Sequence, residues 1–569
     1  MRVLRPALLL VGALVLLWVA AVAVTGFQAS RALQTVASSS KALTRAVGSG
    51  DWTRAKDDAT RLRDAAADAD AATSRWFWRA ASSVPLLGDQ LDPLTAAGAA
   101  SNRIAPAVPG AVQQLQSLED GGLVTDQGQV DLAKVEALVP TVEDLASRTG
   151  QARSLLADAQ KGRLLPPLRP RLDSATQQVV RVDDAARYAA TLLPVVPDML
   201  GAQGPRQYLI GFTNPAEVRP VQGIVGAYGL LSAEDGRLEL EDAGPNSELS
   251  RFRADPAVLG KDFLARYGTD PALIQNVTMS VDASDAAQLL SGIWVGSGHT
   301  RPDGVLFLDP IGVQQLLAGQ RSLQVPGNGK IAVSELTRVL LYDAYVRFGD
   351  NQGARERFLT EVTAAAFSTA LENGVDRNVV QGAARAVQDG HLIVYSANQD
   401  EQRALQAVGA TGTLPAPATQ ARIYLTNADP SKLDNWLTGG ATFQPPCLPG
   451  KPARISLTLH SDVPQDVPAY MQRQDATDDA MARTAQRIVA LYLPPGAEVV
   501  GANLDGKPVG LASRTDKGWR VELSTVEVPA GKDSTLTWYV NGPDGSLPTS
   551  LELQPLLRSD GVRAVGACS

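Results

Sequence analysis

An uninterrupted apolar run near the start of the chain constrains the fold more than any other feature of the sequence. Residues 7–24 read ALLLVGALVLLWVAAVAV and include no charged side chain. A helix rises about 1.5 Å per residue, so this run, extended to Phe27, crosses a hydrocarbon core of roughly 30 Å. The sequence therefore predicts a transmembrane anchor over residues 1–27.

Basic residues lie on one side of this run only. Arg2 and Arg5 precede it, and no basic cluster follows it directly. The positive-inside rule predicts a single-pass protein of the cell membrane, with a cytoplasmic N-terminus and residues 28–569 outside the cytoplasm. A cleaved signal peptide is the alternative, because Ala21-Val22-Ala23 fits a cleavage pattern. We expect the anchor to be retained, since the run is longer than a signal core of about 7–15 residues.

Composition argues against several classes of function. The formal net charge of −8 disfavours nucleic-acid binding, which needs a basic face for the phosphates. The three histidines, His299, His391 and His460, lie far apart, so we expect no metal site. In a domain outside the cytoplasm, Cys447 and Cys568 are predicted to form a disulfide, with two unpaired thiols as the alternative.

Residues 28–200 are predicted to form a helical stalk or bundle. Leu33, Val36, Leu43 and Val47 recur at helical spacing. The segments that follow carry Ala and Leu on one face and charged residues on the other. This pattern is typical of helices that pack against one another.

Strand and helix patterns mix between residues 201 and 446, which indicates an α/β (α+β) domain. Strands are predicted at 207–212, 224–231, 237–240 and 304–309. Helices are predicted at 311–318, 334–348, 353–372, 376–388 and 399–408.

Residues 447–569 are predicted to form a C-terminal β-sandwich. Polar and apolar residues alternate in 454–460, 486–493 and 535–540, with turn residues between them. The predicted disulfide would join the two ends of this domain. The whole chain is thus predicted to be multi-domain, with an anchor, a helical region, an α/β domain and a sandwich.

One stretch of the α/β domain is distinctive. It reads Asn214-Pro215-Ala216-Glu217-Val218-Arg219-Pro220-Val221-Gln222-Gly223-Ile224-Val225-Gly226-Ala227-Tyr228. This stretch resembles the signature of a bacterial family known as domain of unknown function 4012, although Pro215 replaces an Asn and Val221-Gln222 replace Thr-Gly. Residues 303–310 and 427–434 resemble two further segments of that family. The resemblance implies an actinobacterial-type, membrane-anchored envelope protein and carries no established activity.

Charged and glycine residues of this motif are the main candidates for a binding site. Arg219 offers a planar fork that suits a phosphate or carboxylate, and the N–H groups of Gly223 and Gly226 would surround the same anion. The alternative is structural, with Arg219 paired to Glu217 or Asp309 and fixing the turn. The remaining candidates are Asn214, Glu217, Arg206, Arg237 and Asp309.

Scattered carboxylates offer little support for a cofactor. Asp282, Asp285, Asp303 and Asp309 would bind Mg²⁺ only if the protein transfers phosphate. Their spacing matches no metal signature, so solvated loop carboxylates and helix caps are the alternative, and no cofactor is expected.

Two functions remain open, and the sequence does not decide whether the protein is an enzyme. The first is a scaffold or binding protein in cell-wall or surface-polysaccharide assembly, with the cytoplasmic membrane and a glycan, a lipid-linked glycan or another envelope protein as partners. The alternative is a glycopolymer phosphotransferase, or a binder of lipid-linked glycan, with Arg219 as phosphate clamp. It rests on the layout of the chain, which resembles that of the LytR–CpsA–Psr phosphotransferases. An exposed Arg219 in an apolar groove would favour the alternative, and an Arg219 closed against Glu217 would favour the scaffold.

Overall fold

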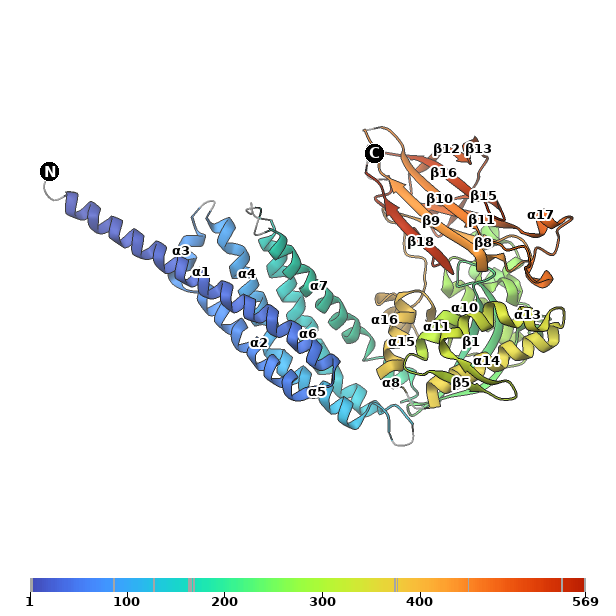
Figure 1. The fold of residues 1–569 in the computed structure, drawn as a ribbon, viewed down its shortest axis with the longest axis horizontal. Coiled ribbons are helices and arrows are strands. Elements are labelled where there is room, and N and C mark those ends of the chain that lie inside the picture. Colours follow the sequence, from blue (N-terminus) through green and yellow to red (C-terminus); the bar gives the residue numbers. More distant parts are fainter. Residues whose placement is uncertain are drawn as a thin grey trace. The chain divides into compact units, whose positions relative to one another are not determined.

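The computed structural model describes residues 4–566, apart from 85–86, 126–127, 162–165, 167–168, 373–374, 376, 449 and 544–545. The chain divides into two compact units. The first comprises residues 1–125 and 131–197, and the second comprises residues 126–130 and 198–569. Figure 1 shows the first unit as helices and the second as sheets with covering helices.

The first unit is helical, as the periodicity predicts. Small side chains such as Ala46, Ala55 and Ala59 are buried where its helices meet, so the helices approach closely. Asp51 caps the second helix, and its side chain accepts a hydrogen bond from the N–H of Arg54 at 3.1 Å. The helices are α1 (Leu4–Gly48), α2 (Trp52–Thr73), α3 (Trp76–Ser82), α4 (Gly88–Ile104), α5 (Val108–Gly121), α6 (Leu132–Ala159) and α7 (Arg169–Leu192).

The apolar run lies in α1, which is long and apolar enough to cross a membrane. Leu16, Leu17 and Phe27 expose most of their surface, while Thr25 and Ala29 are buried against the rest of the unit. Between residues 16 and 29, α1 therefore exposes apolar side chains on one side and packs into the bundle with the other.

A five-stranded sheet with the order β3-β2-β1-β4-β7 forms the centre of the second unit. β1 pairs parallel with β4, and the other neighbours are antiparallel. The strands are β1 (Arg206–Asn214), β2 (Ile224–Glu234), β3 (Arg237–Pro245), β4 (Gly304–Leu308) and β7 (Leu392–Ser396). The first four agree with the strands predicted from the sequence.

Helices cover both faces of this sheet, because its strands are apolar on both sides. Tyr208 and Ile210 of β1 pack with α11, α14 and α15. Leu209 points to the other face and packs with α10. The helices are α8 (Val196–Met199), α9 (Lys261–Tyr267), α10 (Ala283–Gly296), α11 (Pro310–Leu316), α12 (Leu336–Arg338), α13 (Ala344–Phe348), α14 (Gln352–Glu372), α15 (Arg377–Gln388) and α16 (Gln399–Ala407), and a separate hairpin contains β5 (Ser322–Val325) and β6 (Gly329–Ala332).

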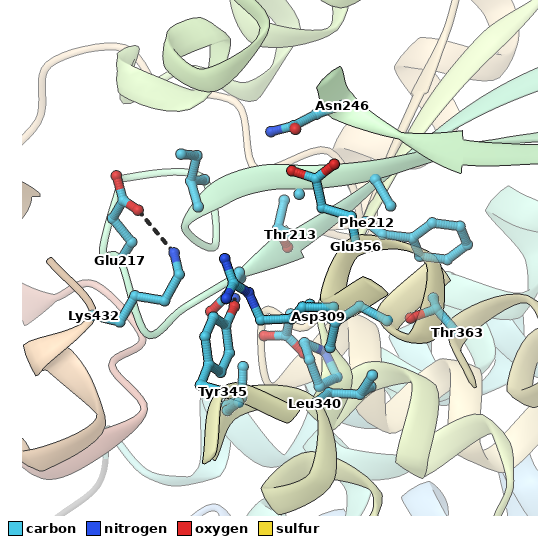
Figure 2. Close-up of a pocket in the computed structure, with 18 of the residues that line it drawn as sticks. Phe212, Thr213, Glu217, Asn246, Asp309, Leu340, Tyr345, Glu356, Thr363 and Lys432 are labelled. Atoms are coloured by element: carbon cyan, nitrogen blue, oxygen red, sulfur yellow. Dashed lines mark hydrogen bonds and ion pairs between the residues drawn. The ribbon is translucent and has the colours of Figure 1, made fainter. Parts of the chain in front are cut away.

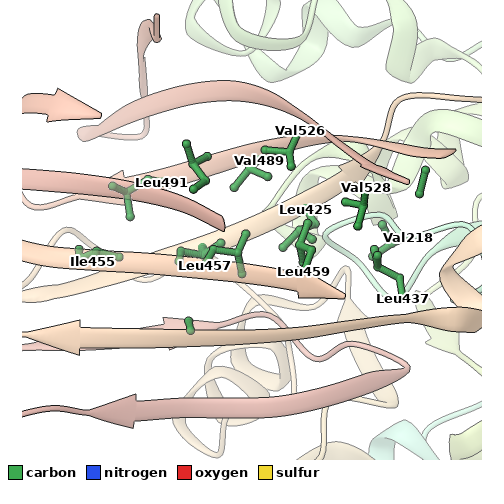
Figure 3. Close-up of a cluster of buried hydrophobic side chains, with 14 of the residues drawn as sticks. Val218, Leu425, Leu437, Ile455, Leu457, Leu459, Val489, Leu491, Val526 and Val528 are labelled. Carbon is green, nitrogen blue, oxygen red and sulfur yellow. The ribbon is translucent and has the colours of Figure 1, made fainter. Parts of the chain in front are cut away.

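Two further sheets enclose a single hydrophobic core, which is the arrangement of a sandwich (Figure 3). Their orders are β13-β12-β16-β10-β9-β18 and β14-β15-β11-β8-β17. Both sheets are mixed, since β17 runs parallel to β8 and β18 runs parallel to β9. The elements are β8 (Gln420–Asn427), β9 (Leu437–Gln444), β10 (Ala453–Ser461), α17 (Asp479–Ala482), β11 (Thr484–Leu493), β12 (Glu498–Leu504), β13 (Lys507–Pro508), β14 (Ala512–Asp516), β15 (Trp519–Pro529), β16 (Asp533–Asn541), β17 (Ser550–Leu553) and β18 (Arg558–Ala564).

The sandwich includes strands that the sequence prediction placed in the α/β domain of residues 201–446. Ile423 and Leu425 of β8 point into the sandwich core, and β8 pairs with β11 along six residues from Arg422 to Asn427. β9 likewise pairs with β10. The two sheets therefore begin before residue 447, because pairing partners distant in sequence decide which sheet a strand joins.

Candidate functional site

The motif forms a loop between β1 and β2, which we call the motif loop (residues 214–223). The side chain of Asn214 accepts a hydrogen bond from the N–H of Ala216 at 2.9 Å, so Asn214 starts the turn. Gly223 ends the turn with φ +110°, and a Cβ there would lie 2.2 Å from the carbonyl oxygen of Asn214. Asn214 and Gly223 therefore shape the backbone.

Arg219 is buried inside this loop and donates to groups of the protein itself. Its Nη1 donates to the carbonyls of Val218 and Asn427, both at 3.1 Å. Its Nη2 lies 3.3 Å from a carboxylate oxygen of Glu217. Burial lowers the pKa of Arg219, and the carboxylate of Glu217 opposes that shift. The guanidinium is closed against Glu217, although Arg219 also lines a cavity of about 600 Å³.

Glu217 holds a second cation, Lys432. The ammonium of Lys432 lies 3.0 Å from the other carboxylate oxygen of Glu217. Burial lowers the pKa of Lys432, but the carboxylate of Glu217 raises this pKa by a larger amount, so the net shift is upward. Lys432 follows β8 in a segment that also bears Asp429 and Asp434. One carboxylate is thus shared by two buried cations.

Asp429 and Asp434 bind a third cation, which is fully buried. Nη1 of Arg487 lies 2.9 Å from Asp429, and its Nε lies 2.7 Å from Asp434. Asp434 also accepts the N–H of Val218 at 2.9 Å, which ties the motif loop to this pair. We call Arg219, Glu217, Lys432, Arg487, Asp429 and Asp434 the ion cluster.

Beside the ion cluster lies a cavity of about 250 Å³, which we call the motif pocket (Figure 2). One wall is apolar and includes Phe212, Leu308 and Leu340. The other wall is polar, and Figure 2 shows Glu217 and Lys432 near Tyr345. The polar lining residues are Thr213, Asn214, Glu217, Asn246, Gln275, Asp309, Tyr345, Gln352, Arg355, Glu356, Thr363, Lys432 and Tyr470.

A π-helical turn, residues 339–343, forms part of the apolar wall. Such turns interrupt the regular backbone ladder and occur often at functional sites. The carbonyl of Leu341 accepts a hydrogen bond from the side chain of Asn435 at 2.8 Å. This bond stabilises the irregular turn and places Leu340 and Leu341 at the pocket.

Arg355 of α14 contributes a buried charge to the polar wall. Its side chain is 2% exposed, and its Nη1 donates to the carbonyl of Gly349 at 2.6 Å. The guanidinium lies 3.6 Å from the ring centre of Tyr470 and 5.2 Å from that of Tyr345. Its Nη2 is buried and has no hydrogen-bond partner among the described residues.

Both carboxylate oxygens of Asp309 have hydrogen-bond partners. One carboxylate oxygen accepts the N–H of Gly312 at 2.8 Å and so caps α11. The other oxygen lies 2.6 Å from Nδ1 of His391. Asp309 therefore lies at the pocket without pairing to Arg219, contrary to one of the two partners considered from sequence.

The other candidates lie elsewhere. Arg206 binds Asp303 at 3.1 Å and Glu401 at 2.6 Å, and it is not among the residues that line the motif pocket. Arg237 pairs with Glu239 on the surface. Asp282 and Asp285 both bind Lys517, and the described part of the chain contains no group of three or more residues that could hold a metal ion.

Sequence reasoning did not single out Tyr345, Arg355 or Tyr470. Arg355 falls in the helix predicted over residues 353–372, where an arginine is usually on the solvent side. It lies three residues before Phe358 and seven before Val362, which are both buried, so helical spacing is the signal that places Arg355 on the buried face and Arg357 on the exposed one. The buried position of Arg355 follows from how α14 packs on the sheet.

Comparison with known families supports part of the resemblance. The segment 203–345 matches the family model described as "Protein of unknown function (DUF4012)". These residues form a DUF4012 domain. The DUF4012 match begins before β1, includes the motif loop, and ends at Tyr345. Neither the curated proteins nor the solved structures contain a match to this chain.

Proposed function

We propose that this chain is a membrane-anchored envelope protein that binds a ligand outside the cytoplasm. It serves as a scaffold or binding protein in the assembly of the cell wall or of surface polysaccharide. Support for the anchor comes from α1, which is long and apolar enough to span a bilayer, and from Arg2 and Arg5 ahead of it. The bulk of the chain lies on the outer side.

Contacts of Trp18 support a retained anchor rather than a cleaved signal. Residues 21–23, which fit a cleavage pattern, lie inside α1. Upstream of them, Nε1 of Trp18 donates to the carbonyl of Phe77 in α3 at 3.1 Å.

The motif pocket is the observation that carries the binding role. It combines an apolar wall with a few polar groups, and Arg355 brings a buried charge to it. Ligand sites in proteins have this composition. Burying a charge that has no carboxylate partner is costly. A buried guanidinium of this kind beside a cavity is therefore more consistent with ligand binding than with a purely structural role.

The same geometry favours binding over glycopolymer transfer. A transferase of the kind considered above would use Arg219 as a phosphate clamp. Arg219 instead donates to Glu217, Val218 and Asn427. Asp309 is held by Gly312 and His391, so neither residue is free to act on a substrate in this arrangement.

Native mass spectrometry of the full-length chain, extracted from membranes in a neutral detergent, tests the binding role. We expect a bound molecule in the wild type and none in Gly226→Trp. Gly226 is the extra residue of a bulge in β2 and lines the pocket, and a Cβ there would lie no closer than 3.9 Å to another atom.

Gly510→Trp is the matched control, since Gly510 is exposed, does not line the pocket, and has no atom within 4 Å of the place that a Cβ would take. It should retain the bound molecule. A wild-type chain that carries no ligand, or a Gly226→Trp chain that keeps it, would contradict the binding role.

We further propose the predicted disulfide between Cys447 and Cys568. Cys568 lies outside the described residues. The support is that β18 runs beside β9, with the N–H of Val565 bonded to the carbonyl of Phe443 at 2.9 Å. A mobility change on reducing gels, absent in Cys447→Ser, is the expected result, and free thiol labelling of both cysteines in the exported chain would contradict it.

A further inference from the structure

The charge of Arg355 is the least compensated feature of the motif pocket. Of the carboxylates that the structure describes, none lies within 4 Å of its guanidinium nitrogens. Two tyrosine rings face the charge, and a carbonyl accepts one of its hydrogen bonds. Cation–π contacts offset only part of the cost of removing a guanidinium from water.

A second cation adds to the positive potential at this position. The ammonium of Lys432 lies 5.8 Å from the ring centre of Tyr345, and the guanidinium of Arg355 lies 5.2 Å from the same ring. Glu217 is the carboxylate nearest to Lys432, and it also serves Arg219. Lys432 and Arg219 therefore share one carboxylate, and Arg355 has none within 4 Å among the described residues.

The other carboxylates of the pocket are engaged away from Arg355. Asp309 binds His391 at 2.6 Å. Glu356 accepts hydrogen bonds from Ser247 at 2.9 Å and Gln352 at 2.8 Å. Figure 2 shows the carboxylate of Glu356 on the side of Asn246, away from Tyr345. The pocket thus has a positive end at Tyr345.

Tyr345 adds a neutral donor at this positive end. Its hydroxyl accepts a hydrogen bond from the side chain of Asn214 at 3.0 Å. Burial raises the pKa of Tyr345, so the hydroxyl keeps its proton at neutral pH. Within the described part of the chain that proton has no acceptor, and it is available to an incoming oxygen atom.

We propose that the motif pocket binds an amphipathic oxyanion, that is, a phosphate or carboxylate joined to an apolar chain. The head accepts hydrogen bonds from Nη2 of Arg355 and from the hydroxyl of Tyr345, and the chain lies along Phe212, Leu308 and Leu340. This inference rests on the proposed binding function and names the class of ligand. A guanidinium suits such a head because its planar donors match the oxygens of both anions.

Isothermal titration of the full-length chain in neutral detergent tests the inference with five probes of defined chemistry. Octyl phosphate and octanoate carry both a charged head and an apolar chain, octanol lacks the charge, and inorganic phosphate and acetate lack the chain. We expect the two amphipathic anions to bind at least about tenfold more tightly than the other three. If inorganic phosphate bound as tightly as octyl phosphate, the site would be assigned to a free anion. That result would overturn the inference that the ligand is amphipathic.

Arg355→Met should lower the affinity for octyl phosphate about 10- to 100-fold and leave the affinity for octanol unchanged. The substitution removes a charge-assisted hydrogen bond and little apolar surface. Arg357→Met, on the exposed side of α14, is the matched control and should change neither probe. Arg355→Lys keeps the charge and should retain part of the affinity, which guards against a methionine variant that does not fold.

Two results would overturn the oxyanion inference. One is equal affinity for octyl phosphate and octanol in the wild type. The other is an octyl phosphate affinity that is unchanged in folded Arg355→Met and Arg355→Lys. If Gly226→Trp still removed the copurified molecule in either case, the proposed binding function would be retained. Only the inference that the ligand has a charged head group would be rejected.

Discussion

The ion cluster and the motif pocket adjoin each other, since Glu217 and Lys432 belong to both, and they differ in how buried charge is paired. In the ion cluster each cation has a carboxylate within 3.3 Å, as Arg219, Lys432 and Arg487 show. In the motif pocket Arg355 is as deeply buried, but its contacts are two rings and a carbonyl. Similar burial with different pairing separates a structural cluster from a candidate site.

The comparison teaches that a buried arginine has to be judged by its partners. The resemblance and the glycine-containing turn drew attention to Arg219, which binds its own loop and the strand next to it. Arg355 lies outside the DUF4012 match and in no motif. It lines the motif pocket and, unlike Arg219, has no carboxylate within ion-pair distance among the described residues.

Removing Arg487 should give the largest effect. Arg487→Met leaves Asp429 and Asp434 buried without their cation, which costs about 3–5 kcal/mol of unfolding free energy. Urea unfolding followed by circular dichroism measures the change. Arg454→Met, an exposed position on β10, should stay within about 0.5 kcal/mol. A loss no larger than that of the control would show that the cluster does not hold the loop.

Alanine substitutions at the two glycines of the motif should change the free energy of unfolding by less than the loss of Arg487, and by different amounts at the two positions. Gly223→Ala places a Cβ 2.2 Å from the carbonyl oxygen of Asn214 at positive φ, so we expect a loss of about 2–3 kcal/mol. Gly226→Ala brings a Cβ no closer than 3.9 Å to another atom, an ordinary contact with the carbonyl oxygen of Phe212, and should stay within about 0.5 kcal/mol. Thermal unfolding of both variants checks this, and equal melting temperatures would refute the assigned role of Gly223.

The sharpest test of the comparison is the stability of the two arginine variants. Arg219→Met should lose about 1–3 kcal/mol, because buried carbonyls and Glu217 lose a partner. Arg355→Met should change stability by less than about 1 kcal/mol, because the removed charge was poorly compensated. Denaturant midpoints of the ligand-free chains compare them. A larger loss in Arg355→Met would make Arg355 the structural residue.

Removing an exposed ion pair should change the free energy of unfolding least. His460 lies 2.5 Å from Asp533 and 2.9 Å from Asp462 on the sandwich surface. Hydrogen bonds that the ring donates to these carboxylates raise the pKa of His460. A raised folded pKa stabilises the protein below about pH 6.5, and that gain is lost as the pH rises through the folded pKa.

Solvent screening limits this gain to below about 0.5 kcal/mol. A histidine NMR titration compared between the wild type and Asp533→Asn measures the shift. A pKa that does not fall in Asp533→Asn would contradict the pairing.

Much of the secondary structure was predictable from sequence. The predicted strand at 224–231 agrees with β2, and the predicted helix at 353–372 agrees with α14. Both carry strong local patterns. No strand was predicted at β7, β8 or β9. The residues of β8 and β9 fell in the predicted α/β domain, because a strand's sheet is decided by partners far away in sequence.

The candidate site was predictable only in part. Asn214, Glu217 and Asp309 line the motif pocket, whereas Arg206 pairs with Asp303 and Glu401 and does not line it. The ion pair between Lys432 and Glu217 joins residues 215 positions apart, and no local pattern predicts such a pairing.

The sequence by itself determined which segments of this protein become helix or strand, because those preferences arise from side-chain spacing within a few turns. It also determined that an apolar helix lies near the start of the chain. Only the tertiary structure decided that residue 223 must be glycine and which arginine has a carboxylate partner. The cost of burying a charge depends on groups brought together across the fold, and Arg219 and Arg355 look alike until those groups are in place.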